Sequence, residues 1–478
     1  MAPLLTASDG SGLRVTSIAA RAVMDEPLAY TELRLVLENP TDAEREGTFR
    51  LALPGARSLV RFAMRVGFEW KEAQAVPLSR ARSAFESIVH QRRDPALIEL
   101  SLGNEWSVRI FPLAPREKRE VIVSYAEDLV GSAYTLPLST LPGAGTHADV
   151  RVVSARGDTL AEHARWPPGE DLRVARRNQS LDGLRDDAFA LMVLRPKLAS
   201  VPSPFSGTIL SIDTSASQSA LFPSSCAIVQ RLAEAIGNQN PAEALAIVAF
   251  DQTAELLYDG PATGHGSAVS ALLRRGALGA SSRAPLSRLL AKLVASGKFS
   301  RLVSIGDGVT SAFRTTDGGA TSTFPSARLR RVDAISVGAV RDDQALKALV
   351  HDGAVIDGAD PWDVVWRKLT TMPATLPVRV DGAHDWYPKA FTGVFPGDEL
   401  HLFAKVAATD RPRVTLGSVA ITPSLQRASS PLLELAWARA KLTHLLATPR
   451  EATRPALVDE VAAFAGKYQL PSPYTGLL

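Results

Sequence analysis

The chain lacks features that mark several large classes of protein. Its single cysteine, Cys226, excludes an intrachain disulfide framework and a cysteine-rich zinc site. No run of lysine and arginine is interleaved with aromatic residues, so nucleic acid is not an expected partner. No stretch approaches the roughly 20 apolar residues that cross a bilayer, and residues 1–5 lack the charged start of a signal peptide. We therefore expect no membrane insertion by this chain.

What the chain does have is the size and composition of a multidomain globular protein. Its 478 residues exceed the usual size of one hydrophobic core, and this length predicts about three domains. Hydrophobic residues make up 46% and charged residues 22%, values that are ordinary for soluble globular proteins. Composition does not fix the compartment. We expect a chain that is soluble as given and that belongs to a longer product, exported from the cytoplasm or anchored to a membrane.

Hydrophobic residues recur with a period of two from residue 13 to about residue 129. Leu33, Leu35 and Leu37, for example, alternate with more polar neighbours. This period predicts the strands of an antiparallel β-sandwich. Helical spacing appears at 79–93, so we expect one helix to interrupt the sheet.

Strand and helix patterns alternate after the proline-rich turn at 202–204. Strands are expected at 207–212, 244–250, 300–305 and 332–338, and helices at 221–236, 266–275, 284–296 and 342–350. Such alternation predicts a doubly wound parallel sheet covered by helices on both faces.

The expected fold class is therefore multidomain α/β plus β, in three parts. Residues 1–200 form the sandwich with its inserted helix, 206–355 the doubly wound domain, and 356–478 strands that pack back on a sheet, followed by helices. Apolar runs at 148–153 and 189–194 are expected to extend the first sandwich. The two C-terminal helices are expected at 431–446 and 455–468.

Oxygen-bearing side chains follow two of the expected parallel strands. Asp213, Ser215 and Ser217 come directly after the first strand, and Asp307 ends the third. The loop that contains Ser281 precedes a helix. Loops at the carboxyl ends of parallel strands converge, and Asp and Ser oxygens suit a hard cation such as Mg2+. A metal site is thus predicted, although Asp and Ser also cap helices.

This constellation resembles the metal-ion-dependent adhesion site (MIDAS) of von Willebrand factor type A domains, which are Rossmann-like. In that family an aspartate and two serines of the first loop, a threonine of the second and an aspartate of the third surround Mg2+. The resemblance implies metal ligation by Asp213, Ser215, Ser217 and Asp307. Ser281 stands where the family usually has threonine, and it still offers a hydroxyl.

A second resemblance is carried by segments that occur in consistent order between residues 13 and 130. They are 38–40, 53–56, 62–66, 81–86, 92–97 and 104–113. Together they resemble the VIT domain, named after vault protein and inter-alpha-trypsin inhibitor, and 92–97 is typical of bacterial members. The tail at 433–439 and 468–478 is similar to the segment after the type A domain in inter-alpha-trypsin inhibitor heavy chains and their bacterial relatives.

These resemblances imply a metal-dependent module for adhesion or protein–protein interaction. The expected metal is Mg2+, with Mn2+ or Ca2+ as alternatives, and the expected partner is a protein that offers an Asp or Glu carboxylate. A structural, self-assembling scaffold with a vestigial metal site is the alternative. An enzyme is not expected, because metal-dependent hydrolysis needs a general base and two aspartates among hydroxyls offer none. Asp251 could approach the site, but a role in a turn is favoured.

Overall fold

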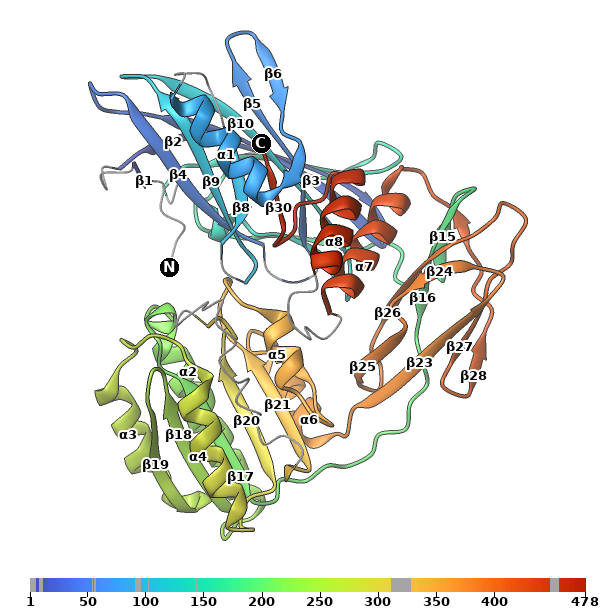
Figure 1. Ribbon diagram of the computed structural model, residues 1–478. Coiled ribbons are helices and arrows are strands. Elements are labelled where there is room, and N and C mark those ends of the chain that lie inside the picture. Colours follow the sequence, from blue (N-terminus) through green and yellow to red (C-terminus); the bar gives the residue numbers. More distant parts are fainter. Residues whose placement is uncertain are drawn as a thin grey trace. The chain divides into compact units, whose positions relative to one another are not determined.

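Figure 1 shows a computed structural model that describes residues 6–7, 12–53, 55, 57–90, 96–101, 103–141, 145–310, 328–447 and 455–478. The chain forms two compact units. The first contains Met1–Pro196, Pro377–Phe391 and Glu399–Leu478, and the second contains Lys197–Leu376 and Thr392–Asp398. Much of the C-terminal part therefore belongs to the unit in which the chain begins. The division into 1–200, 206–355 and 356–478 stays a prediction. In the described residues no helix is long and apolar enough to cross a membrane.

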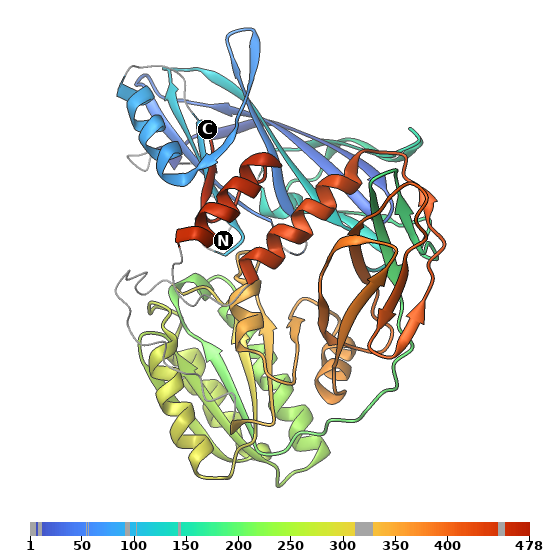
Figure 2. The ribbon, with the colours of Figure 1, turned by 45° about the vertical axis from the view of Figure 1, so that its right-hand side comes forward.

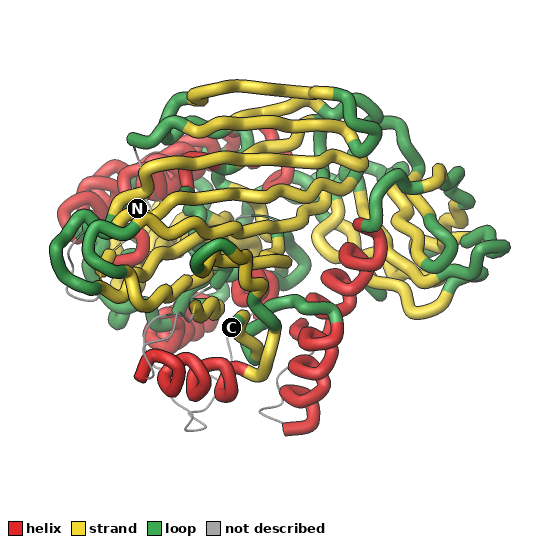
Figure 3. The backbone as a smooth tube through the Cα atoms, turned by 90° about the horizontal axis from the view of Figure 1, so that it is seen from above, coloured by secondary structure: helices red, strands yellow, loops and turns green. Residues whose placement is uncertain are grey.

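Two sheets enclose the main core of the first unit. One contains, in spatial order, β1 (Thr6–Ala7), β4 (Arg45–Ala52), β9 (Glu105–Leu113), β8 (Ala96–Leu100), β30 (Thr475–Leu477) and β7 (Ala75–Pro77). The other contains β13 (Thr159–Trp166), β12 (Ala148–Ser154), β2 (Arg14–Asp25), β3 (Leu28–Glu38), β10 (Lys118–Asp128), β5 (Ser58–Val66) and β6 (Glu69–Glu72). Figure 3 shows these long strands side by side.

The period of two corresponds to strands that bury alternate side chains, as predicted. Leu33, Leu35 and Leu37 each expose 1% of their surface and face the core of the sandwich, whereas Arg34 between them pairs with Glu120 on the outer face. The expected helix is α1 (Leu78–His90), whose Ala81 and Phe85 are buried. Residues 54, 56 and 92–95, which belong to the segments of the VIT resemblance, lie outside the described part of the chain.

The last strand of the chain, β30, belongs to the same sheet as the first strand, β1. β30 lies between β8 and β7, with Gly476 opposite Val76 and Leu477 opposite Ile98. Leu477 is 2% exposed and joins the core of the sandwich. Before β30 come the two expected helices, α7 (Leu432–Ala447) and α8 (Pro455–Lys467).

One expected extension of the sandwich is wrong. β12 does join the seven-stranded sheet, but β16 (Phe189–Leu194) lies in a separate sheet with β24 (His384–Tyr387), β26 (Leu400–Lys405), β15 (Gly183–Arg185) and β29 (Gln426–Arg427). Leu191 of β16 packs with α7, and Met192 packs in a different cluster. A strand buried on both faces shows no alternation, so its sequence does not reveal which sheet it joins.

Two smaller sheets are also present. One contains, in spatial order, β25 (Ala390–Val394), β23 (Ala374–Asp381), β27 (Arg413–Leu416) and β28 (Val419–Ile421). The other is the pair β11 (Ala133–Leu136) and β14 (Leu172–Ala175). Single turns of 3-10 helix occur at η1 (Leu138–Thr140) and η3 (Ala262–Gly264).

The second unit has the doubly wound architecture that the alternation predicted. Its sheet has the order β19 (Ala254–Pro261), β18 (Ala244–Phe250), β17 (Thr208–Asp213), β20 (Arg301–Gly306), β21 (Arg331–Ser336) and β22 (Val355–Asp357). The neighbouring pairs from β18 to β22 are parallel, and β19 is an antiparallel edge strand that the sequence pattern did not predict.

Helices cover both faces of this sheet (Figures 1 and 2). On one face lie α2 (Phe222–Gln239), α3 (Gly266–Arg275) and α6 (Trp362–Thr370), and on the other lie α4 (Arg283–Ala295) and α5 (Asp343–Leu349). Leu210 and Ile212 of β17 pack towards the first set, and Ile209 packs towards the second. Both faces are therefore apolar, which leaves the ends of the strands for polar chemistry.

A half-buried glutamate in the first unit, Glu399, has an unusually acidic side chain. Glu399 accepts hydrogen bonds from Arg176 at 2.8 Å and from Arg195 at 2.7 Å, and His401 lies 3.2 Å away. Burial raises the pKa of Glu399, but the hydrogen bonds from His401 and Arg176 outweigh it and lower the pKa to about 2. The ionised carboxylate therefore stabilises the folded first unit.

We expect Glu399→Gln to lower the stability of the first unit most at neutral pH. A carboxyl whose folded pKa is depressed contributes stability above its unfolded pKa of about 4.3, and this contribution is lost as the pH falls through about 2. Urea unfolding midpoints at pH 7, 5 and 3 should show the gap from wild type narrowing with acid. The exposed Glu434→Gln should follow wild type throughout, and a constant Glu399→Gln gap would contradict the prediction.

Candidate metal centre

Three loops of the second unit meet at the carboxyl end of β17. Asp213 is the last residue of β17, and Asp307 directly follows the neighbouring parallel strand β20. The second loop is attached to the first by a parallel bridge between Ser215 and Gly279, and by a hydrogen bond from the Ala216 N–H to the Gly279 carbonyl at 2.7 Å. This attachment places Ser281 beside Asp213.

The five residues expected at the metal site are connected by hydrogen bonds. Ser281 Oγ donates to Asp213 Oδ2 at 3.3 Å, and the Ser215 N–H donates to Asp213 Oδ1 at 2.8 Å. Ser215 Oγ and Ser217 Oγ lie 3.0 Å apart, and Ser217 Oγ donates to Asp307 Oδ2 at 2.8 Å. The structure thus brings all five together, and their role as metal ligands stays a prediction.

Both carboxylates are buried close to one another. Asp213 is 3% and Asp307 2% exposed, and in the described chain neither forms a salt bridge. Burial, followed by the charge of Asp307, raises the pKa of Asp213 to about 6. Burial also raises the pKa of Asp307, against the hydrogen bonds from Ser217 and the Val309 N–H. Two desolvated acids without a contacting cation are a donor set that fits a divalent metal.

The donors are oxygens, and this restricts the class of metal site. Among the described residues no group of three or more His, Cys, Asp and Glu side chains is placed to hold a metal. The site instead combines two carboxylates with the hydroxyls of Ser215, Ser217 and Ser281. Ser217 is exposed, so the group of donors opens to water on that side. A hard cation that retains water or accepts an external oxygen matches this arrangement.

Asp251 stabilises the loops of the site through hydrogen bonds. Its Oδ1 accepts from the Thr253 N–H at 2.9 Å, and its Oδ2 accepts from Thr214 Oγ1 at 2.9 Å and from Arg275 at 2.8 Å. Burial opposes ionisation, but these bonds lower the pKa of Asp251. The bond to Thr253 is the turn role that the sequence favoured. The bonds to Thr214 and Arg275 connect this turn to the loop of Ser215.

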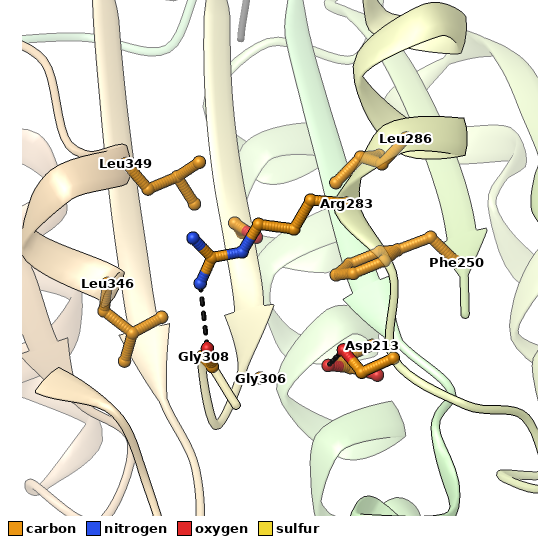
Figure 4. A pocket seen from close by; sticks show the side chains of 10 residues that line it. Asp213, Phe250, Arg283, Leu286, Gly306, Gly308, Leu346 and Leu349 are labelled. Atoms are coloured by element: carbon orange, nitrogen blue, oxygen red, sulfur yellow. Dashed lines mark hydrogen bonds between the residues drawn. The ribbon is translucent and has the colours of Figure 1, made fainter. Parts of the chain in front are cut away.

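Further residues at the site are not marked by any sequence motif. Gln218, in the 3-10 turn η2 (Ala216–Gln218), is 2% exposed and its side chain hydrogen bonds to Asp307. Arg283 lines a cavity of about 20 Å³ together with Asp213 and Ser281 (Figure 4). Such a volume holds on the order of one water molecule. Only the proximity of Gln218 and Arg283 to the motif residues in sequence could have suggested them.

Gly306 is required where β20 passes Asp213. A Cβ atom at residue 306 would lie 2.8 Å from the Cβ of Asp213, which is closer than carbon atoms approach without displacement. We expect Gly306→Ala to lower the free energy of unfolding of the second unit by about 1–3 kcal/mol, as overpacking does. Urea unfolding followed by circular dichroism measures the change.

The matched control is Gly266→Ala at the start of α3, where a Cβ would meet nothing within 4 Å. Its stability should stay within about 0.5 kcal/mol of wild type. A Gly306→Ala chain as stable as the control would show that the backbone of β20 does not constrain Asp213.

Comparison with solved structures gives matches of low identity. A von Willebrand factor type A protein from Catenulispora acidiphila is 12% identical, with a TM-score of 0.29, over 56% of this chain and 76% of that chain. The ArnB paralog VWA2 from Sulfolobus acidocaldarius is 14% identical, with a TM-score of 0.26, over 59% and 85%. Proximal thread matrix protein 1 from the mussel byssus, with a zinc-occupied MIDAS motif, is 12% identical, with a TM-score of 0.27, over 39% and 52%.

Comparison with protein families and curated proteins gives one match. No curated protein matches the sequence. Residues 15–125 match the model of the vault protein inter-alpha-trypsin domain, which confirms the VIT resemblance over that segment. The chain thus carries a VIT domain, and von Willebrand factor type A domain proteins are among its structural neighbours.

Proposed function

We propose that the chain is a protein-interaction module whose second unit binds a divalent cation. The ligands would be Asp213, Ser215, Ser217, Ser281 and Asp307. The observation that carries the proposal is the convergence of two buried carboxylates and three hydroxyls from separate loops at one strand end. A bound cation would offer a coordination position to a carboxylate of a protein partner, an Asp or Glu side chain.

The donor set favours Mg2+, or Mn2+ with similar preferences. Mg2+ typically takes one or two carboxylates and keeps waters or partner oxygens in its remaining positions. Ca2+ takes 6–8 oxygens, and the five side chains of this site would supply fewer. Ser281 supports the assignment, because its hydroxyl already contacts Asp213 where the family usually has threonine. We therefore place Mg2+ first and keep Ca2+ as the weaker alternative.

An adhesive role fits the site better than hydrolysis does. Metal-dependent hydrolysis needs a general base within reach of a bound water. Among the described residues that line the cavity, the titratable side chains are Asp213 and Arg283, and none is a histidine. Asp213 would itself be a ligand, and an arginine remains protonated. The residues present therefore support binding of a carboxylate, without an evident group to activate water.

Asp213→Ala tests metal binding and the fold separately. We expect the affinity for Mg2+, measured by titration calorimetry, to fall on the order of 100-fold, because affinity depends on the number of charged ligands. The metal-free variant should be as stable as wild type or more so, because the substitution removes a buried charge that repels Asp307. The exposed Asp363→Ala should bind as wild type does. Equal Mg2+ affinity in wild type and Asp213→Ala would count against the proposal.

Light scattering separates this function from a self-assembling scaffold with a vestigial metal site. The scaffold alternative is supported by β13, which forms an edge of the seven-stranded sheet and is largely exposed. An exposed edge strand can pair with a strand of another chain. For an interaction module we expect no large assemblies in any of the four samples, which are wild type and Asp213→Ala, each in Mg2+ and in EDTA. Large assemblies that persist in all four samples would favour the scaffold.

A further inference from the structure

Arg283 is a positively charged side chain beside the candidate metal site, and no described carboxylate forms a salt bridge with it. Arg283 is the first residue of α4, and it lines the same cavity as Asp213 and Ser281 (Figure 4). Its guanidinium donates to the Gly308 carbonyl at 2.9 Å and to the Ala345 carbonyl at 3.3 Å. Within the ranges that the structure describes, Arg283 forms no salt bridge.

Arg275, which is also close to the loops, differs from Arg283 because it forms salt bridges. Arg275 donates to Asp251 Oδ2 at 2.8 Å and to Glu255 at 2.5 Å, so two carboxylates match its single charge. Its remaining bonds reach Thr214 and Thr253. Arg275 therefore stabilises the turn behind the site, and its charge is not available to the two buried aspartates.

The position of Arg283 is unfavourable for its own helix. A cation at a helix N-terminus opposes the helix dipole. The cavity walls include Phe250, Leu286 and Leu346, and burial among them lowers the pKa of Arg283. The groups that favour a cation here are the carboxylates of Asp342, Asp213 and Asp307, which act on it through space. Asp342 also caps α5 through the Ala345 N–H, and within the described residues neither it nor the two site aspartates forms a salt bridge.

We propose that Arg283 is a fixed countercharge of the metal-free site, an inference that rests on the metal-binding function proposed above. Its guanidinium offsets part of the repulsion between Asp213 and Asp307 when no cation is bound. The same charge opposes the arrival of a divalent cation, because the apolar walls screen it poorly. Arg283 thus lowers the affinity for metal and stabilises the empty site. It is a positioning residue, and its bond to the Gly308 carbonyl also holds the third loop.

Arg283→Met tests the countercharge, since it keeps much of the side-chain length and removes the charge. We expect Mg2+ binding to become at least about tenfold tighter by titration calorimetry. We also expect the metal-free variant to melt below wild type, and saturating Mg2+ to narrow that difference. Arg283→Lys, which keeps the charge, should bind Mg2+ nearly as wild type does. Arg288→Met, at an exposed position of the same helix, should change neither quantity.

A folded Arg283→Met chain that binds Mg2+ no more tightly than wild type would overturn the countercharge proposal. The proposed metal binding would still stand. Wild type that releases no heat with Mg2+ overturns the proposed function, and the countercharge with it. If Arg283→Met folds only in Mg2+, this supports the inference. If it folds in neither condition, Arg283→Gln is titrated in its place, and the same tightening is expected.

Discussion

The second unit depends on how it accommodates two like charges that are buried together. Asp213 and Asp307 are as inaccessible as core side chains, and the charge of Asp307 adds to burial in raising the pKa of Asp213. An uncompensated buried carboxylate is costly, so the surroundings supply hydroxyls, backbone N–H groups and the nearby charge of Arg283. A divalent cation would compensate the two acids more strongly than any of these. Two carboxylates buried together with hydroxyls are a donor set that suits a hard divalent cation.

The sequence revealed much of this unit because its signals are local. In a parallel sheet all strands end at one edge, so acids that follow two buried strands must lie close together. The strand that ends at Asp213 and helix α3 were predicted almost to the residue, because the strand is a short apolar run and the helix has an unbroken helical pattern. Asp213, Ser215, Ser217 and Asp307 were predicted as ligands because they follow two of these strands and resemble the adhesion-site motif. Ser281 was predicted because it stands where the resembling family usually has threonine.

What the sequence did not reveal depends on contacts between distant segments. β16 is apolar throughout, and that pattern does not say which sheet it joins. β19 is half exposed at an edge, where the apolar signal is weak. The insertion of β30 between β8 and β7 brings together residues nearly 400 positions apart. Arg283 belongs to no motif, and only the structure shows that it lines one cavity with Asp213 and Ser281.

We propose that one divalent cation is held by oxygens from three loops at the end of β17. Anomalous diffraction from crystals of this protein soaked in Mn2+ tests that claim most directly. The account predicts one strong peak in contact with the oxygens of Asp213, Asp307 and the neighbouring serines, and no such peak in Asp213→Ala crystals. An empty site in wild-type crystals at saturating Mn2+, with both carboxylates still hydrogen bonded only to protein, would contradict it.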